Sequence, residues 1–327
     1  MTSKNLAQLA DGNIHKEDLE LEKQLKLVNK PSVKSIHTKF GYIVDCIDIN
    51  KQPAFDHPLL KNHKLQLKPS LQKSSRETIV KNSTVKSIFG LHKVQCPTGT
   101  VPIRRILKDD LIRSKLFNNH ILTQEKHGYH YADVFLKPEY APYYGVSGTN
   151  SVYNPIVLRS DQFTSSHLRV QNGPIQAADQ IRLGWHVAPQ LYGGDEGTYL
   201  FSSWDKRTKN WWVSIQNENI GYFPATLFSN MSSGDYVGWG GETITPPGTP
   251  SPQMGSGYLP DRVFVHACYF RNVAIQSEPR ISYGPPDSYV ATFKDKPDCF
   301  DALYYGNLKH EVGYSLQFGG PGGVCGD

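Results

Sequence analysis

Two strand-like segments of the sequence place a charged side chain beside glycine. One is Ile181-Arg182-Leu183-Gly184-Trp185, and the other is residues 236–244, in which Glu242 follows two glycines. Side chains alternate along a strand, so we expect Arg182 to share a face with Gly184, and Glu242 to share a face with Gly240. A glycine beside a polar side chain can leave uncovered space on the sheet, into which the backbone of a ligand could fit. Glu242 could therefore do acid–base chemistry there, or it could be an ordinary solvent-facing strand residue.

Other groupings of reactive residues give weaker signals. His127, His130 and Asp133 could form a metal trio, but the segment reads as a strand, whose odd spacings split side chains between two faces. The sequence has no Gly-x-Ser-x-Gly elbow, which a serine hydrolase of that type would need. The glycines around Trp239 lack the βαβ context of a dinucleotide site. We therefore expect no metal and no cofactor.

The five cysteines are placed unevenly along the chain. Cys46 and Cys96 lie in the first half, whereas Cys299 and Cys325 bracket the C-terminal tail. This placement predicts one disulfide in each half, with Cys268 left as a buried thiol in a strand. None of the cysteines shows CxxC spacing, so neither a zinc site nor a redox site of that kind is expected.

Signals for the cellular compartment conflict. Asn82 and Asn230 begin N-glycosylation sequons, which matter if the chain enters the secretory pathway. The residues after Met1 contain no apolar run, so no signal peptide is visible, and no segment is apolar enough to cross a membrane. The disulfide pattern favours an extracellular protein, whereas the N-terminus does not.

The pattern of elements predicts two domains. The pattern of residues 16–30 predicts a helix with Leu21, Leu25 and Val28 on one face. Short strands are expected around residues 41–47. Residues 64–85 are expected to form a flexible linker, and residues 106–116 a short helical stretch. We place a smaller α+β domain at residues 1–120 and a second domain at residues 121–327.

The second domain reads as almost entirely β. Short strands are separated by Gly- and Pro-rich turns and no helices alternate with them, which is typical of an antiparallel β-sandwich. The strands are expected in a hairpin over residues 204–211 and at residues 220–223, 236–244, 262–276 and 313–319.

Charge is distributed asymmetrically between the halves. Residues 1–120 hold 21 Lys+Arg against 11 Asp+Glu, a balance of +10, and residues 121–327 hold 14 against 19, a balance of −5. Opposite balances are consistent with docking of the two halves, and equally with two ordinary solvated surfaces. Scattered lysines without a recognised motif argue against nucleic acid as a partner.

Aromatic residues are frequent in the second half. They could line a groove for a proline-rich peptide, whose polyproline II backbone suits aromatic faces. They could instead fill the core of the sandwich, which we favour because aromatic side chains dominate core burial. The residues concerned are Trp185, Trp204, Trp211, Trp212, Tyr222 and Trp239.

Several runs resemble the neprosin family of plant proteins. In the first half they are residues 45–63, whose stretch from Gln52 to His63 is very specific, and residues 96–105. In the second half the matching runs are Gly184-Trp185, Leu191-Tyr192-Gly193, Asn210-Trp211-Trp212, Gly240-Gly241-Glu242, Gln253-Met254-Gly255-Ser256-Gly257 and Tyr269-Phe270-Arg271-Asn272.

The resemblance implies a secreted zymogen, with an activation peptide that precedes a β-sandwich glutamic endopeptidase acting on proline-containing peptides. Two glutamates then face each other across a cleft, because peptide hydrolysis needs a base for the water and an acid for the intermediate. One family glutamate maps onto Glu242. The other maps onto Arg182, two residues before the Gly-Trp pair.

This difference predicts impaired hydrolysis. An arginine does not release its proton and would hold a nearby Glu242 ionised. The alternative to a peptidase is a non-catalytic sandwich that binds peptide or cell-wall material. Glu196, Glu218 and Asp179 could in principle replace the missing acid, but each reads as a turn or surface residue. Only 60 positions separate Arg182 from Glu242, whereas the family resemblance implies a much longer connection. The second domain is therefore expected to be shortened internally.

Overall fold

The computed structural model describes residues 16, 18–38, 41–70, 96–123, 128–174, 177–189, 201–204, 208–215, 218–278 and 281–325. Contacts divide the chain into two compact units, of which the N-terminal unit comprises Met1–Leu67 and Ser74–Lys115 and the C-terminal unit comprises Lys68–Lys73 and Leu116–Asp327. The division falls inside helix α2 (Lys108–Thr123), as does the predicted boundary at residue 120. Most of the predicted linker, from residue 71 onward, lies outside the described residues.

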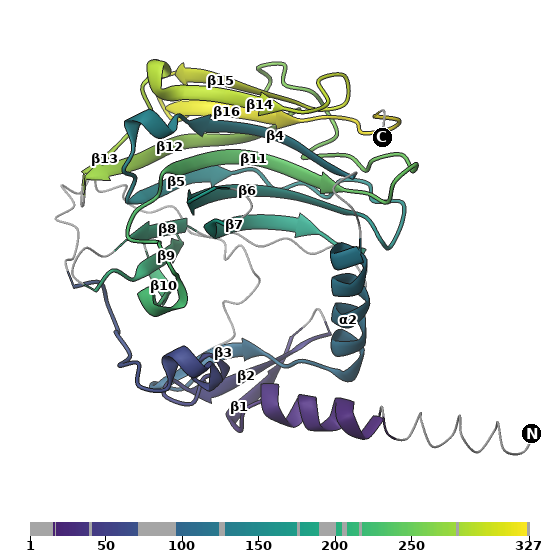
Figure 1. The fold of residues 1–327 in the computed structure, drawn as a ribbon, viewed down its shortest axis with the longest axis vertical. Helices are drawn as coiled ribbons and strands as arrows, with labels where there is room; N and C mark the ends of the chain where they lie inside the picture. The colour runs from purple at the N-terminus through teal and green to yellow at the C-terminus, as the bar shows by residue number, and fades with distance from the viewer. Residues whose placement is uncertain are drawn as a thin grey trace, which may run out of the picture. The chain divides into compact units, whose positions relative to one another are not determined.

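The N-terminal unit combines helices with one small sheet (Figure 1). A helix over residues 18–28 ends before Pro31, as predicted from the apolar stripe. Strands β1 (Ser32–His37), β2 (Ile43–Asp48) and β3 (Thr100–Arg104) form an antiparallel sheet in the order β1-β2-β3. The predicted disulfide Cys46–Cys96 closes a loop of 50 residues in this unit.

A bidentate ion pair fixes the end of this sheet. Arg105 donates from Nε to Oδ2 of Asp45 and from Nη2 to Oδ1, both at 2.7 Å. Ser35 donates to the same carboxylate at 2.6 Å. The Arg105 hydrogen bonds, helped by Ser35, outweigh burial and lower the pKa of Asp45, so this carboxylate is ionised wherever the pH is near neutral.

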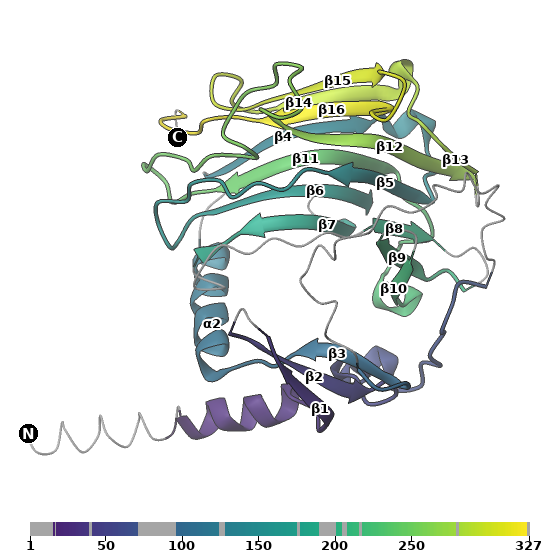
Figure 2. The same ribbon diagram turned by 180° about the vertical axis from the view of Figure 1, so that it is seen from behind.

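The C-terminal unit holds two antiparallel sheets (Figures 1 and 2). The five-stranded sheet has the order β14-β4-β11-β6-β7, with β4 at Tyr129–Leu136, β6 at Phe163–Asn172, β7 at Asp179–Val187, β11 at Tyr236–Ile244 and β14 at Val290–Lys294. Strand β11 has the predicted bounds and pairs with β4 on one side and with β6 on the other.

The eight-stranded sheet has the order β10-β9-β8-β5-β12-β16-β15, with β13 paired to β12. Its strands are β5 (Gly145–Asn150), β8 (Phe201–Trp204), β9 (Trp211–Ile215), β10 (Glu218–Phe223), β12 (Cys268–Glu278), β13 (Ile281–Tyr283), β15 (Asp301–Asn307) and β16 (Tyr314–Gly319). The predicted hairpin is present as β8 paired with β9. Residues 262–267, predicted as strand, are not: Arg262 has a φ of 68° and lies in a turn held by Asp261.

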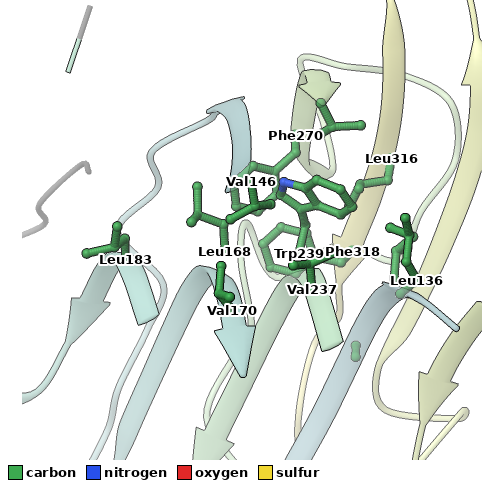
Figure 3. Close-up of a cluster of buried hydrophobic side chains, with 14 of the residues drawn as sticks. Leu136, Val146, Leu168, Val170, Leu183, Val237, Trp239, Phe270, Leu316 and Phe318 are labelled. Carbon is green, nitrogen blue, oxygen red and sulfur yellow. The ribbon is translucent and has the colours of Figure 1, made fainter. Parts of the chain in front are cut away.

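One hydrophobic core joins the inner faces of the two sheets. Figure 3 shows Trp239 and Leu168 of the five-stranded sheet beside Phe270 and Leu316 of the other. Trp185, Trp211 and Trp239 belong to this core. Trp212 is also buried, but it follows Trp211 on β9, so its side chain lies on the other face of the strand, against Tyr222. The side chain of Trp204 lies outside the described residues. Packing of two antiparallel sheets face to face confirms the mainly β, sandwich-like fold.

Two further predictions concern the cysteines and membranes. Cys299 and Cys325 form the second predicted disulfide, and Cys268 is a buried free thiol whose pKa burial raises to about 12. Within the described ranges, no helix has the length and apolar character needed to span a membrane.

Candidate functional site

The outer face of the five-stranded sheet carries the polar residues of the candidate site. Strand β11 presents its apolar Val237 and Trp239 to the core, so its even-numbered residues lie on the opposite face. In register with Glu242 are Tyr131 on β4 and Ser165 on β6. In register with Gly240 are Asp133 on β4 and His167 on β6, which pairs in turn with Gly184 on β7.

Arg182 and Glu242 form an ion pair on this face. Nη1 of Arg182 donates to Oε2 of Glu242 at 2.5 Å, and Nε of Arg182 donates to Gln180 at 3.2 Å. The Arg182 side chain is 32% exposed, whereas that of Glu242 is 8% exposed. Burial disfavours the charged guanidinium, but Glu242, Tyr131 and Asp133 together outweigh this and raise the pKa of Arg182.

A second charged pair lies beside the first and is more deeply buried. Nη2 of Arg169 donates to Oδ2 of Asp133 at 2.8 Å and to the hydroxyl of Tyr236 at 2.7 Å. The side chains of Arg169 and Asp133 are 7% and 3% exposed. His167 is also buried, with Nε2 3.5 Å from Oδ1 of Asp133. We call Asp133, His167, Arg169, Arg182 and Glu242 the charged cluster.

Burial sets the protonation of the cluster. It raises the pKa of Asp133 to about 6 against the opposing effects of Arg169 and Arg182, and the charge of Glu242 adds to the rise. Burial, Arg182 and Arg169 together lower the pKa of His167 well below its ordinary value, so this imidazole is neutral near pH 7. Burial and the charge of Glu242 raise the pKa of Tyr131 to about 12. Asp133 therefore takes up a proton in mildly acid solution.

Comparison with protein families decides where the chain belongs. The model described as neprosin matches residues 160–207 and 203–321, and the model described as neprosin activation peptide matches residues 35–135. The chain belongs to the neprosin family. The activation-peptide match gives it a propeptide-like part, and the two segments of the other match meet at residues 203–207.

In this neprosin-family chain, Gly184 and Gly240 do not leave the uncovered space on the sheet that the sequence suggested. A Cβ atom on Gly240 would lie 2.3 Å from Oδ1 of Asp133 and 2.2 Å from the carbonyl oxygen of Ala132. One on Gly184 would lie 1.9 Å from the carbonyl oxygen of Ser166. The prediction was wrong here because the space is already filled, at Gly240 by the Asp133 carboxylate and the backbone of β4, and at Gly184 by the backbone of β6.

The other acids proposed as replacements do not join Glu242. Asp179 accepts hydrogen bonds from the Ser229 hydroxyl and the Asn230 backbone, at 3.0 Å and 2.6 Å, and so holds a turn. Glu218 begins strand β10, which belongs to the eight-stranded sheet. Glu196 lies outside the described residues.

The remaining predicted sites are dispersed. Asp133 belongs to the charged cluster, whereas His130 bonds through Nδ1 to Asp295 at 2.6 Å, and His127 lies outside the described residues. In the part of the chain that the structure describes, no three His, Cys, Asp or Glu residues are grouped so as to hold a metal ion. Asn230 is exposed and Asn82 is not described, so glycosylation of either stays a prediction.

Sequence reasoning missed three members of the cluster. Asp133 was considered only as a metal ligand, and His167 and Arg169 were not singled out. The signal was present in the alternation of β4 and β6, where apolar residues such as Val134 and Leu168 occupy even positions and the charged residues occupy odd ones. The same alternation that placed Arg182 and Glu242 would have placed these residues beside them.

Proposed function

We propose that this chain is a zymogen-like member of the neprosin family whose peptidase site no longer hydrolyses peptides. The ion pair between Arg182 and Glu242 carries the proposal. If position 182 corresponds to the second family glutamate, a guanidinium occupies the place from which a carboxyl group would exchange protons with Glu242. An ion pair has no proton to share, and loss of one acid–base partner typically costs ~10²–10⁴ in rate.

A cleavage assay tests the loss of hydrolysis. We expect no cleavage when the purified chain is incubated at acid pH with a proline-containing peptide, and we expect Glu242→Gln to change nothing. Cleavage that this substitution abolishes would overturn the proposal. The Arg182→Glu variant is the matched gain-of-function control, because it returns a carboxyl group to the position; its continued inactivity would place the defect in the shortened region between residues 182 and 242 instead.

The chain is also proposed to be extracellular. Two disulfides are consistent with an oxidising compartment, and the family resemblance supports secretion. Recovery of the natural protein from a reducing compartment, with all its cysteines as thiols, would refute this assignment.

A further inference from the structure

The outer face of the eight-stranded sheet carries buried polar side chains whose hydrogen-bonding groups are not all satisfied. Leu316 and Phe318 of β16 belong to the core, so Ser315 and Gln317 lie on the opposite face of this strand. Both are 0% exposed. The hydroxyl of Ser315 and Nε2 of Gln317 have no hydrogen-bond partner in the described part of the chain. Buried polar atoms are nearly always hydrogen-bonded, so two such atoms on one strand need an explanation.

The surroundings of Gln317 fix the orientation of its amide. Oε1 accepts from the backbone nitrogens of Asp261 and Arg262, at 3.1 Å and 2.7 Å, and from the hydroxyl of Tyr305 at 2.7 Å. The opposite orientation would turn the NH₂ group toward two backbone N–H donors, which cannot accept a hydrogen bond. Nε2 therefore lies on the side away from these backbone donors, and its N–H groups require an acceptor there.

Strand β12 adds a positive charge beside these donors. Its Phe270 pairs with Leu316 of β16, and the two strands lie side by side in Figure 1. One residue further along, the same register brings Arg271 next to Ser315 and makes it a diagonal neighbour of Gln317, within reach of a long side chain. Nε of Arg271 is buried and unpartnered, and no described acid forms an ion pair with this guanidinium.

Acids on the surrounding segments do not neutralise Arg271. Asp261 bonds to a histidine of its own turn, and Asp301 of β15 accepts from a lysine of β14 at 2.5 Å. Glu311, which lies between β15 and β16, is exposed and not bonded to Arg271. The three unsatisfied groups are thus two N–H donors and a hydroxyl, with one positive charge and no negative charge among them.

Aromatic side chains cover this part of the sheet. The ring of Phe264 lies edge-on to those of Tyr269 and Tyr305, with centroids 5.2 Å and 6.2 Å away. The guanidinium of Arg262 lies 5.3 Å from the centroid of Tyr305. This cover explains why Gln317 is inaccessible, and it limits any ligand to a very small one. A water molecule could satisfy the hydroxyl and the amide, but it would not balance the charge of Arg271.

We propose that Arg271, Ser315 and Gln317 form a binding site for one small anion of the size of chloride. The guanidinium supplies the charge, and the hydroxyl and the amide NH₂ supply hydrogen bonds. Gln317 also holds the turn at residues 261–262 through Oε1, so the anion and the turn stabilise each other. The site lies on the other sheet from the charged cluster and does not depend on whether the chain hydrolyses peptides.

Urea denaturation of the full chain in sodium chloride tests the site, with sodium gluconate at equal ionic strength as the reference. Selectively excited tryptophan fluorescence reports on the C-terminal unit. If chloride binds only the folded chain, the unfolding equilibrium constant falls by the factor 1 + [Cl⁻]/Kd, about tenfold at nine times Kd. Chloride should therefore raise the midpoint of the unsubstituted chain above its value in gluconate.

A pair of arginine substitutions locates this effect. Arg271→Gln should remove the difference between chloride and gluconate, whereas Arg159→Gln, which removes a half-exposed arginine from the same unit, should keep it. No difference between the salts in the unsubstituted chain, or an equal difference in both variants, would overturn the proposal.

The Gln317→Glu variant at pH 8 gives a second test that does not need Arg271→Gln to fold. Glutamate keeps one oxygen for the three donors and puts a second oxygen in place of Nε2, so the chain would supply the anion itself. In gluconate its midpoint should rise toward that of the unsubstituted chain in chloride, and chloride should add nothing further. If the site holds only water, the new carboxylate is a buried charge, and the midpoint should fall in both salts. That result would refute the anion site.

Discussion

Replacing Arg169 with methionine should lower the free energy of unfolding of the C-terminal unit by about 3–5 kcal/mol at pH 8. Methionine fills a similar volume but leaves Asp133, whose side chain is 3% exposed, without its counter-ion, and leaves the Tyr236 hydroxyl without its donor. All five tryptophans lie in this unit, so tryptophan fluorescence, excited selectively in a denaturant titration, reports on it alone.

The cost of Arg169→Met should depend on pH. Burial already holds the pKa of Asp133 at about 6, and loss of Arg169 removes an influence that lowers it. Asp133 is then protonated at pH 5, and the uncompensated charge disappears, so the loss should be much smaller there than at pH 8. A loss that is the same at both pH values would contradict the burial of this charge.

A surface pair provides the matched control. Arg159 and Asp161 also lie 2.8 Å apart, but half of the Arg159 side chain is exposed. Arg159→Met should leave the free energy of unfolding nearly unchanged at either pH, because exposed ion pairs contribute little. Equal effects of the two substitutions would mean that the charged cluster is solvated like an ordinary surface.

Removing the disulfide Cys46–Cys96 should destabilise the N-terminal unit by about 4 kcal/mol, the loop-closure entropy expected for 50 residues. We expect the most protected amides of β2 to exchange with solvent deuterium about a thousandfold faster in the Cys46→Ser/Cys96→Ser variant. The small core of this unit, with Val44, Ile47 and Leu60 among its few buried residues, offers little to compensate.

The second disulfide serves as the control for this experiment. Cys299–Cys325 closes a loop of 26 residues in the C-terminal unit, so the Cys299→Ser/Cys325→Ser variant should leave exchange in β2 unchanged. Unchanged protection of β2 in the first variant would show that hydrogen bonding and packing hold this sheet without the cross-link.

The fold was largely predictable because burial on one face enforces alternation. Strand β11 was located with the observed bounds, since Val237 and Trp239 must face the core and only one register allows this. The prediction of a strand over residues 262–267 was wrong for a local reason. Val263 and Val265 read as strand, but the Asp261 carboxylate caps a turn there and both valines are exposed.

The candidate site was predictable only in part. Arg182 and Glu242 were expected near each other and are bonded, but they come from β7 and β11, two strands apart in the sheet. The intervening strand β6 supplies His167 and Arg169, and the sheet order that places it there depends on long-range pairing that no local pattern encodes. Without that order, Asp133 could not be recognised as a neighbour of Glu242.

A double-mutant cycle on Arg182 and Glu242 tests the central claim most directly. Unfolding free energies of the unsubstituted chain, Arg182→Gln, Glu242→Gln and the double variant at pH 8 give the coupling between the two side chains without reference to activity. Because Glu242 is buried and Arg182 is one-third exposed, we predict a favourable coupling of about 1–3 kcal/mol, between the values of surface and buried pairs. A coupling indistinguishable from zero would mean that Arg182 forms no stabilising ion pair with Glu242, and the explanation for lost hydrolysis would fail.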